Sequence, residues 1–236
     1  MTAALPQHKI FPISDSALTI DYGNIINEDI NIRVLSLFRQ FQNDPLTGMI
    51  EAVPAYSSLT IYYDLFQMRK LVPPDRTLYE WIVQQVEERL QQPFEMSIET
   101  RELIHIPVCY EKEFAPDIEQ LAKEKNISVE EVVRIHTSKP YRVYMLGFLP
   151  GFSYMGEVDE RISVPRKTQP QPVEMGSIGI AGKQTGIYPS ASPGGWYIIG
   201  RTALKLFDAE KEELTLLKAG DHVQFISISK DEFKSY

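Results

Sequence analysis

The first hundred positions alternate between the apolar period of a strand and that of a helix. Positions 18–22 alternate apolar and polar residues as a strand does, and apolar residues at positions 30–41 then recur at helical spacing. Positions 49–53 and 59–63 are short runs rich in β-forming residues, with a proline between them. The pattern therefore predicts a strand, a helix and then two strands joined by a turn.

A second helix is predicted to begin at Thr77. Thr77 and Glu80 have the spacing of a capping box, in which each side chain bonds to the backbone N–H group of the other residue, and apolar residues continue at helical spacing to Leu90. Positions 94–98 suit a closing strand. The order β-α-β-β-α-β is typical of a ferredoxin-like domain, an antiparallel sheet with two helices on one face, which we place at residues 1–100.

The pattern changes at Leu103, where alternating apolar residues predict a strand that runs to Tyr110. Two short helices follow this strand. Pro116 suits the first turn of one helix, and Ser128 suits the N-terminal cap of the other. Asn126 can end the first of the two in the left-handed conformation. This strand and the two helices are therefore expected to open a second domain.

From position 141 the chain has the pattern of short strands broken by glycine and proline. The clearest of them are positions 141–146, 177–181, 196–199, 214–217 and 222–228. Many short strands with frequent turns indicate a β-barrel or a β-sandwich. We therefore expect an α+β protein whose second domain occupies residues 101–236, with the boundary near positions 98–103.

Composition excludes several classes of protein. The 236 residues are enough for two small domains, and no apolar stretch approaches the length of a membrane span. The N-terminus lacks the basic and then apolar pattern of a signal peptide, so we expect a cytoplasmic protein. A net charge of −8 without a basic stripe argues against nucleic-acid binding. The single Cys109 and four scattered histidines exclude an internal disulfide and argue against a tightly held metal ion.

Ten of the thirteen glycines lie at positions 147–200, which makes this segment the most unusual part of the chain. Glycine allows tight turns and close backbone approach because it has no Cβ atom. Aromatic residues and single cations lie between these glycines. The aromatic residues either form a core beneath the loops or line a groove for a ligand or a partner chain, and the two uses can coexist. They are Phe148, Phe152, Tyr154, Tyr188 and Trp196.

Gly182 and Lys183 resemble the end of a phosphate-binding P-loop, but the match fails. Ser177 stands where the first glycine of that motif belongs, and Gln184 stands where the motif needs serine or threonine. Prolines that follow break any helix whose N-terminus could face a phosphate. Lys183 is therefore either a solvated lysine on a turn or a cation that meets an anion held by backbone N–H groups.

Other candidates for chemistry are single residues. His136 at the end of a predicted helix either rests on the last helix carbonyl groups or transfers protons at the glycine-rich surface. Cys109 on an apolar strand is expected to be an inert buried thiol, and Ser153 lacks the pattern of a nucleophile elbow. Arg166 and Arg201 lie among turns, where a guanidinium either clamps a carboxylate or phosphate or satisfies loop carbonyls.

The motifs of the second domain resemble the allophanate hydrolase subunit 1 family, which also supplies the B-subunit of the bacterial ATP-dependent 5-oxoprolinase. The residues that carry the resemblance are Tyr110, Pro116-Asp117, the helix end at 132–136, the run 141–156, Pro165-Arg166, Gly176-Ser177, the run 184–189 and the run 192–202. The resemblance implies a cyclophilin-like β-barrel for the second domain. The N-terminal half fits the family mostly by its pattern of elements.

The resemblance also implies a function. Family members work with a KipA-type partner (allophanate hydrolase subunit 2) and a LamB/YcsF-type subunit, and the complex opens the lactam of 5-oxoproline to glutamate with ATP as co-substrate. The chain is then a non-autonomous subunit of an ATP-hydrolysing cyclic amidase, without a tightly held metal of its own. The chain is similar as well to family members that inhibit autophosphorylation of a sporulation sensor histidine kinase. A pure inhibitor that binds the dimerisation domain of such a kinase is therefore the alternative.

The family motifs, together with the cations and aromatic residues above, give two sets of candidate residues. The expected catalytic residues are His136, Arg166 and Arg201. The residues expected to line a groove for substrate or partner are Phe148, Pro150, Phe152, Lys183, Gln184, Tyr188, Pro193, Gly194, Gly195 and Trp196. Gln171 departs from the family, whose members usually have arginine there, so either anion binding is weakened at this point or the position is structural.

Overall fold

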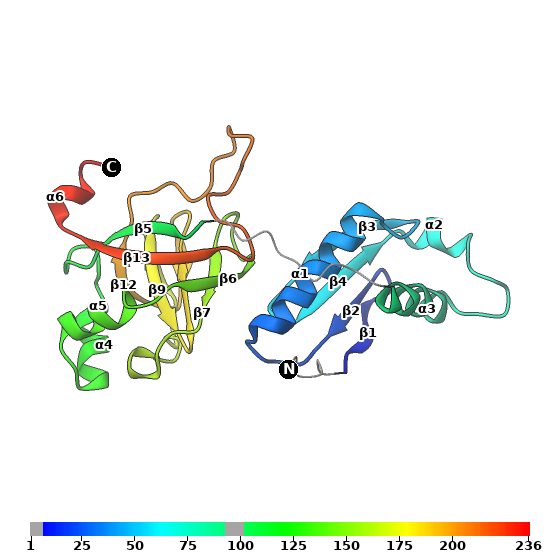
Figure 1. The fold of residues 1–236 in the computed structure, drawn as a ribbon, viewed down its shortest axis with the longest axis horizontal. Coiled ribbons are helices and arrows are strands. Elements are labelled where there is room, and N and C mark those ends of the chain that lie inside the picture. Colours follow the sequence, from blue (N-terminus) through cyan, green and yellow to red (C-terminus); the bar gives the residue numbers. More distant parts are fainter. Residues whose placement is uncertain (1–6, 93–101) are drawn as a thin grey trace. The chain divides into compact units, whose positions relative to one another are not determined.

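The structure is a computed structural model that describes residues 7–92 and 102–236. Contacts divide the chain into two compact units, Met1–Glu99 and Thr100–Tyr236, and each unit has an apolar core of its own (Figure 1). Of the helices in the described ranges, none is both long enough and apolar enough to cross a membrane.

The first unit is a four-stranded antiparallel sheet with helices packed on one face. Its elements are β1 (Lys9–Ser14), β2 (Ala17–Asp21), α1 (Glu28–Asn43), β3 (Met49–Pro54), β4 (Ser58–Tyr63), α2 (Leu65–Arg69) and α3 (Leu78–Gln91). The strand order across the sheet is β1-β2-β4-β3. Leu18 of β2 and Ile61 of β4 share one buried core with Phe41 of α1 and Val86 of α3. The sheet and the two long helices therefore stabilise each other.

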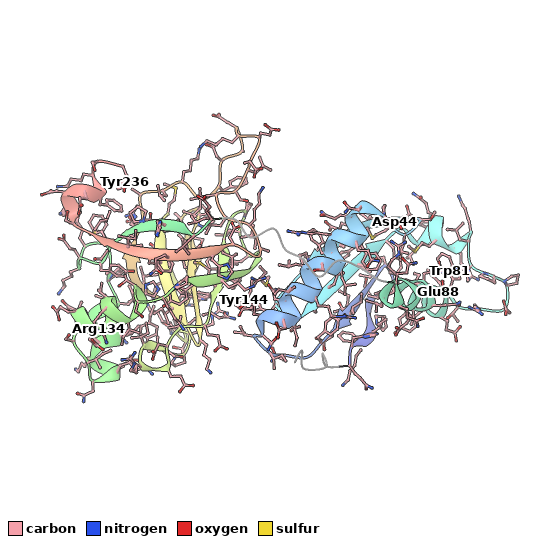
Figure 2. The ribbon with its side chains drawn as sticks, viewed as in Figure 1. Asp44, Trp81, Glu88, Arg134, Tyr144 and Tyr236 are labelled. Carbon is pink, nitrogen blue, oxygen red and sulfur yellow. The ribbon has the colours of Figure 1, made fainter. Side chains whose placement is uncertain are left out.

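Local signals in the sequence explain where these elements begin. Thr77 and Glu80 form both hydrogen bonds of the predicted capping box at the start of α3, from which Glu88 extends on an exposed side (Figure 2). β1 and α2 were not predicted, and β1 occupies the sheet edge beside β2. The strand predicted at 94–98 lies outside the described residues.

The second unit is a closed β-barrel with short helices beside it. Its elements are β5 (Ile104–Cys109), α4 (Ile118–Lys125), α5 (Val129–His136), β6 (Tyr141–Leu146), β7 (Ser153–Gly156), the 3₁₀ helix η1 (Glu160–Ile162), β8 (Gln171–Val173), β9 (Ser177–Ala181), β10 (Gln184–Ile187), β11 (Ser192–Gly194), β12 (Tyr197–Arg201), β13 (His222–Ile228) and α6 (Lys230–Phe233). Seven strands close the barrel in the order β10-β7-β6-β13-β5-β12-β9, and β8 pairs with β11 in a separate sheet. The α+β class with a barrel in the second half is thus confirmed.

The first and last strands of the barrel are neighbours. β13 pairs in parallel with β5 and antiparallel with β6, and Figure 1 shows the red β13 running beside the green β5. The barrel therefore closes only when β13 takes its place between them. Its interior is filled by large buried side chains such as Tyr141, Ile178 and Phe225.

Most of the strand and cap predictions for this unit are confirmed. Asn126 ends α4 with φ 54° and ψ 43°, and Ser128 caps α5 by accepting from the backbone N–H of Glu131. The strand predicted at 214–217 was wrong, because in that stretch only Thr215 makes a β-bridge, to Phe207.

Candidate functional site

A tight turn at residues 147–152 presents Phe148 to solvent. Leu149 N–H donates to the Gly147 carbonyl at 2.9 Å, which makes Phe148 the central residue of a three-residue γ-turn. Its φ is +70°, a value that costs a residue with a Cβ atom roughly 1–3 kcal/mol. The side chain is 62% exposed. The chain thus accepts backbone strain to hold an exposed aromatic ring, which is typical of a binding surface.

Beneath this ring lies a cluster of aromatic side chains that meet edge to face. Phe152 contacts Tyr188 with ring centres 5.0 Å apart, Trp196 at 5.5 Å and Tyr154 at 4.7 Å. Phe152, Tyr188 and Trp196 are almost fully buried, and Tyr154 is half-buried. Edge-to-face packing fixes the ring orientations, so the cluster forms a rigid wall.

The aromatic wall borders a cavity of about 330 Å³. Its lining residues are Phe148, Phe152, Tyr154, Arg166, Pro170, Gln184, Tyr188, Pro193, Gly194, Gly195 and Trp196. Arg166 is the one charged side chain among these described residues, and Gln184 adds an amide that can both donate and accept hydrogen bonds. The cavity therefore combines apolar walls with a single positive charge, an arrangement suited to a small organic anion.

The charge of Arg166 is not neutralised within the part of the chain that the structure describes, because no carboxylate there forms an ion pair with it. Its field lowers the pKa values of the Tyr154 and Tyr188 phenols, but burial acts in the opposite direction and dominates. Burial raises the pKa of Tyr188 to about 12 and also raises the pKa of Tyr154. Both phenols are therefore neutral at pH 7 and can donate hydrogen bonds.

The cavity contains most of the residues that the sequence picks out for a groove. Arg166 lines it together with Phe148, Phe152, Gln184, Tyr188, Pro193, Gly194, Gly195 and Trp196. Pro150 and Lys183 do not line it, although both are exposed. The Lys183 ammonium lies 3.3 Å from a carboxylate oxygen of Glu160, and the two side chains are 48% and 82% exposed. Lys183 is therefore a solvated turn lysine in this structure.

Arg201 lies apart from this cavity, in a second depression of about 250 Å³ that Glu113 and Glu174 also line. Its guanidinium pairs with the Glu174 carboxylate, and its Nε–H donates to the Met175 carbonyl at 2.8 Å. These contacts tie β12 to the loop between β8 and β9. The structure thus gives Arg201 the loop-satisfying role that the sequence left open, and it does not bring Arg201 to Arg166.

His136 lies inside the barrel and does not face the glycine-rich surface. Its Nδ1 is 2.8 Å from the Tyr110 hydroxyl, and its Nε2 is 3.1 Å from the Thr185 hydroxyl. The ring stacks on Phe225 with centres 4.5 Å apart. Burial lowers the pKa of His136 to about 3. A neutral imidazole, with one donor and one acceptor nitrogen, fits these two hydroxyl partners.

Acid is expected to destabilise the second unit through His136. The folded chain keeps the ring neutral down to about pH 3, whereas the unfolded chain binds a proton near pH 6.5. The unfolded state therefore binds more protons between these values, and the free energy of unfolding falls as the pH drops, with a slope of about 0.7 kcal/mol per pH unit at pH 6.5 that approaches about 1.4 kcal/mol per pH unit near pH 5.5. Urea unfolding between pH 7 and 5.5 measures this slope, before most carboxylates titrate.

The His136→Gln variant should lose this slope, whatever its absolute stability. His105→Gln is the matched control, because His105 is exposed on β5, and it should keep the slope. A slope in His136→Gln equal to that of the unchanged chain contradicts the prediction.

Among the described residues, no group of three or more His, Cys, Asp or Glu side chains is placed to hold a metal ion. The sequence placed Asp117 in a family motif but predicted no contact between it and Lys167, although their charged groups lie 2.6 Å apart next to the cavity wall. The two residues are fifty positions apart, so no local pattern predicts their contact. The signals in the sequence were the place of Asp117 in a family motif and the position of Lys167 beside Arg166.

Comparison with known proteins gives matches along almost the whole chain. A family model described as carboxyltransferase domain, subdomain C and D, matches residues 8–217. A Bacillus subtilis (strain 168) protein, named as the B-subunit of 5-oxoprolinase, is 44% identical over 232 residues, which are 98% of this chain and 97% of that protein. The protein of the same name from Escherichia coli O157:H7 is 34% identical over 223 residues, which are 92% of this chain and 95% of that protein. These matches confirm the resemblance found in the sequence.

A solved structure shares the fold. The crystal structure of TTHA0988 matches 90% of this chain with a TM-score of 0.76 and 30% sequence identity. The match covers 40% of that chain, so the present chain spans less than half the length of TTHA0988.

Proposed function

Because this chain belongs to the family of carboxyltransferase domains, subdomain C and D, we propose that it is the B-subunit of an ATP-dependent 5-oxoprolinase in the cytoplasm. Two relatives that match it over almost their full length carry the name of this 5-oxoprolinase component. The complex opens the lactam ring of 5-oxoproline to give glutamate, with ATP as co-substrate. Phosphoryl transfer to the lactam oxygen makes the ring carbon electrophilic enough for water to attack it.

The cavity around Arg166 carries this proposal. 5-Oxoproline is a small carboxylic acid with a flat amide, and the cavity offers a guanidinium for the carboxylate, the Gln184 amide for the lactam group and aromatic walls for the ring. Arginine binds a carboxylate through two parallel hydrogen bonds, so it also orients the ring. Arg166 is thus the residue that we assign to substrate binding.

The same cavity explains why the chain works as part of a complex. Its described lining contains no carboxylate and no imidazole, and its two phenols are neutral at pH 7. Such a lining binds and orients a substrate but has no group that takes up or releases a proton near neutral pH. We therefore infer that the groups for proton and phosphoryl transfer come from other subunits.

TTHA0988 supports the need for a partner, because this chain corresponds to only 40% of it. The remainder of that longer protein has no counterpart in this chain. We propose that separate polypeptides, a KipA-type protein and a LamB/YcsF-type subunit, supply what this chain lacks.

Reconstitution tests the function. The purified chain is mixed with its KipA-type and LamB/YcsF-type partners, and ADP release and glutamate formation are measured with and without 5-oxoproline. We expect both products only when all three proteins and 5-oxoproline are present. ATP hydrolysis that is equally fast without 5-oxoproline, together with no glutamate, would overturn the proposal.

A second function is favoured by the exposed rim of the cavity. Phe148, Pro150 and Pro193 are all exposed there or beside it, and such a rim suits the apolar ridges of a helical bundle. We propose that the chain also docks on the dimerisation domain of a sensor histidine kinase and blocks autophosphorylation. Equal inhibition by the unchanged chain and by Phe148→Ala would place the contact elsewhere.

A further inference from the structure

Arg166 lies in a stretch without regular secondary structure, between the bridge residue Val164 and strand β8. The backbone hydrogen bonds of a strand or a helix therefore do not fix the position of the Arg166 guanidinium. The next residue is fixed at two points. Lys167 N–H donates to the Gly195 carbonyl at 2.8 Å, and the Lys167 ammonium lies 2.6 Å from Asp117 Oδ2. The contacts of Lys167 thus hold this irregular stretch on the barrel.

Asp117 is itself fastened to the barrel. Its Oδ2 also accepts the backbone N–H of Ile198 at 2.7 Å, and its own backbone N–H donates to the Ile198 carbonyl at 3.0 Å. The Lys167 and Asp117 side chains are only 18% and 14% exposed, and the ammonium lies 5.5 Å from the centre of the Tyr197 ring. A partly buried pair with these additional partners is held far more firmly than an ion pair on the surface.

The pair is coupled to the cavity through Gly195. The Arg166 Nε and Nη2 atoms lie 3.7 Å from the point where a Cβ atom on Gly195 would stand, so the guanidinium rests against this glycine. The carbonyl of the same glycine accepts the bond from Lys167. A displacement of Lys167 therefore moves the neighbouring arginine and the surface on which that arginine rests.

We propose that Asp117 and Lys167 are positioning residues that hold the Arg166 guanidinium in the cavity for the carboxylate of the substrate. The identity of that carboxylate rests on the function proposed above. The positioning is a property of the free chain, so the first of the two tests below needs no substrate.

The first test reads the order of Arg166 directly. In the purified chain, the Nε–Hε NMR signal of Arg166 is assigned by its absence in Arg166→Lys. The ¹⁵N relaxation of this Arg166 signal is then measured in the unchanged chain and in the variants Lys167→Met and Asp117→Asn. Methionine keeps most of the lysine volume, and asparagine keeps an oxygen for the Ile198 N–H, so both variants are expected to fold. We expect the ordered signal to be lost in both. An equally ordered signal in folded variants overturns the proposal.

The second test uses the reconstituted complex. Lys167→Met is expected to raise the KM for 5-oxoproline about tenfold and to change kcat less than about twofold, because a substrate-binding group is misplaced and the reacting groups are not. In an Arg166→Ala background the same change should add nothing, since there is no guanidinium left to position. Equal increases of KM in both backgrounds indicate a merely structural role and overturn the proposal.

The two tests separate the two proposals. The signal can show a disordered Arg166 side chain in Lys167→Met while the complex made with the unchanged chain forms no glutamate. This result supports the positioning and rejects the 5-oxoprolinase function. If the Arg166 side chain stays ordered in Lys167→Met and the complex made with the unchanged chain forms glutamate, only the positioning is rejected.

Discussion

Replacing Arg166 by alanine is expected to lower kcat/KM of the reconstituted complex for 5-oxoproline about 100-fold, almost entirely through KM. Arg166 is the one charged group in the described lining of the cavity, so without it the carboxylate is placed among aromatic rings and prolines with no counter-charge. A 100-fold loss corresponds to about 2.7 kcal/mol, within the range for a hydrogen bond to a charged group. Steady-state ATP hydrolysis at varied 5-oxoproline concentration measures the effect.

Two further variants sharpen this prediction. Arg166→Lys keeps the charge but loses the planar pair of donors, so we expect a smaller loss, about tenfold. Arg134→Ala is the matched control, because Arg134 (Figure 2) is an exposed arginine of the same unit that pairs with Glu131 on α5 and does not line the cavity. It should leave KM unchanged. If Arg166→Ala behaves like Arg134→Ala, the cavity is not the substrate site.

Replacing Gly194 by alanine is expected to destabilise the second unit by about 2–4 kcal/mol and to deform the cavity. A Cβ atom at this position would stand 2.4 Å from the Tyr188 hydroxyl oxygen and 2.9 Å from a methyl carbon of Val173. Both side chains are buried in the aromatic cluster, so neither can turn away without opening a void. Glycine is thus required here for close approach of the phenol to the backbone.

The neighbouring variant Gly195→Ala is the matched control. Its Cβ atom would meet nothing closer than 3.4 Å, so it should cost less than about 1 kcal/mol. Urea unfolding followed by tryptophan fluorescence in a Trp81→Phe background reports on Trp196, the other tryptophan of the chain, and hence on the second unit. Equal stability of the two alanine variants would contradict the prediction, because it would show that the aromatic cluster rearranges around the added Cβ atom at little cost.

Elements that depend on local pattern could be predicted well. The cap of α3 at Thr77, the left-handed end of α4 at Asn126 and the bounds of β6, β9 and β13 all follow from residues within a few positions of one another. Strand order does not follow from such signals, because the pairing of β13 with β5 joins residues more than a hundred positions apart. The pattern of the sequence therefore did not distinguish between a β-barrel and a β-sandwich for the second domain.

In the candidate site, too, some features could be predicted from the sequence and others could not. The density of glycine and aromatic residues led to Arg166, Tyr188 and Trp196, which the fold brings to one cavity. The sequence offered His136 either the last helix carbonyls or the glycine-rich surface, and it could not predict the observed partners, which are the hydroxyl groups of Tyr110, just after β5, and of Thr185 on β10. The sequence likewise could not distinguish Arg166, which lines the cavity, from Arg201, which pairs with the carboxylate of Glu174.

The place of β13 between β5 and β6 also bears on biosynthesis. During translation, β5 emerges early and lacks its parallel neighbour until Ile228 has left the ribosome. Through that interval the nascent unit carries two apolar strands with unpaired edges, which attract other incomplete chains. Slow synthesis of the residues between β5 and β13 therefore favours aggregation, and chaperones that shield emerging strands should improve the yield of this protein.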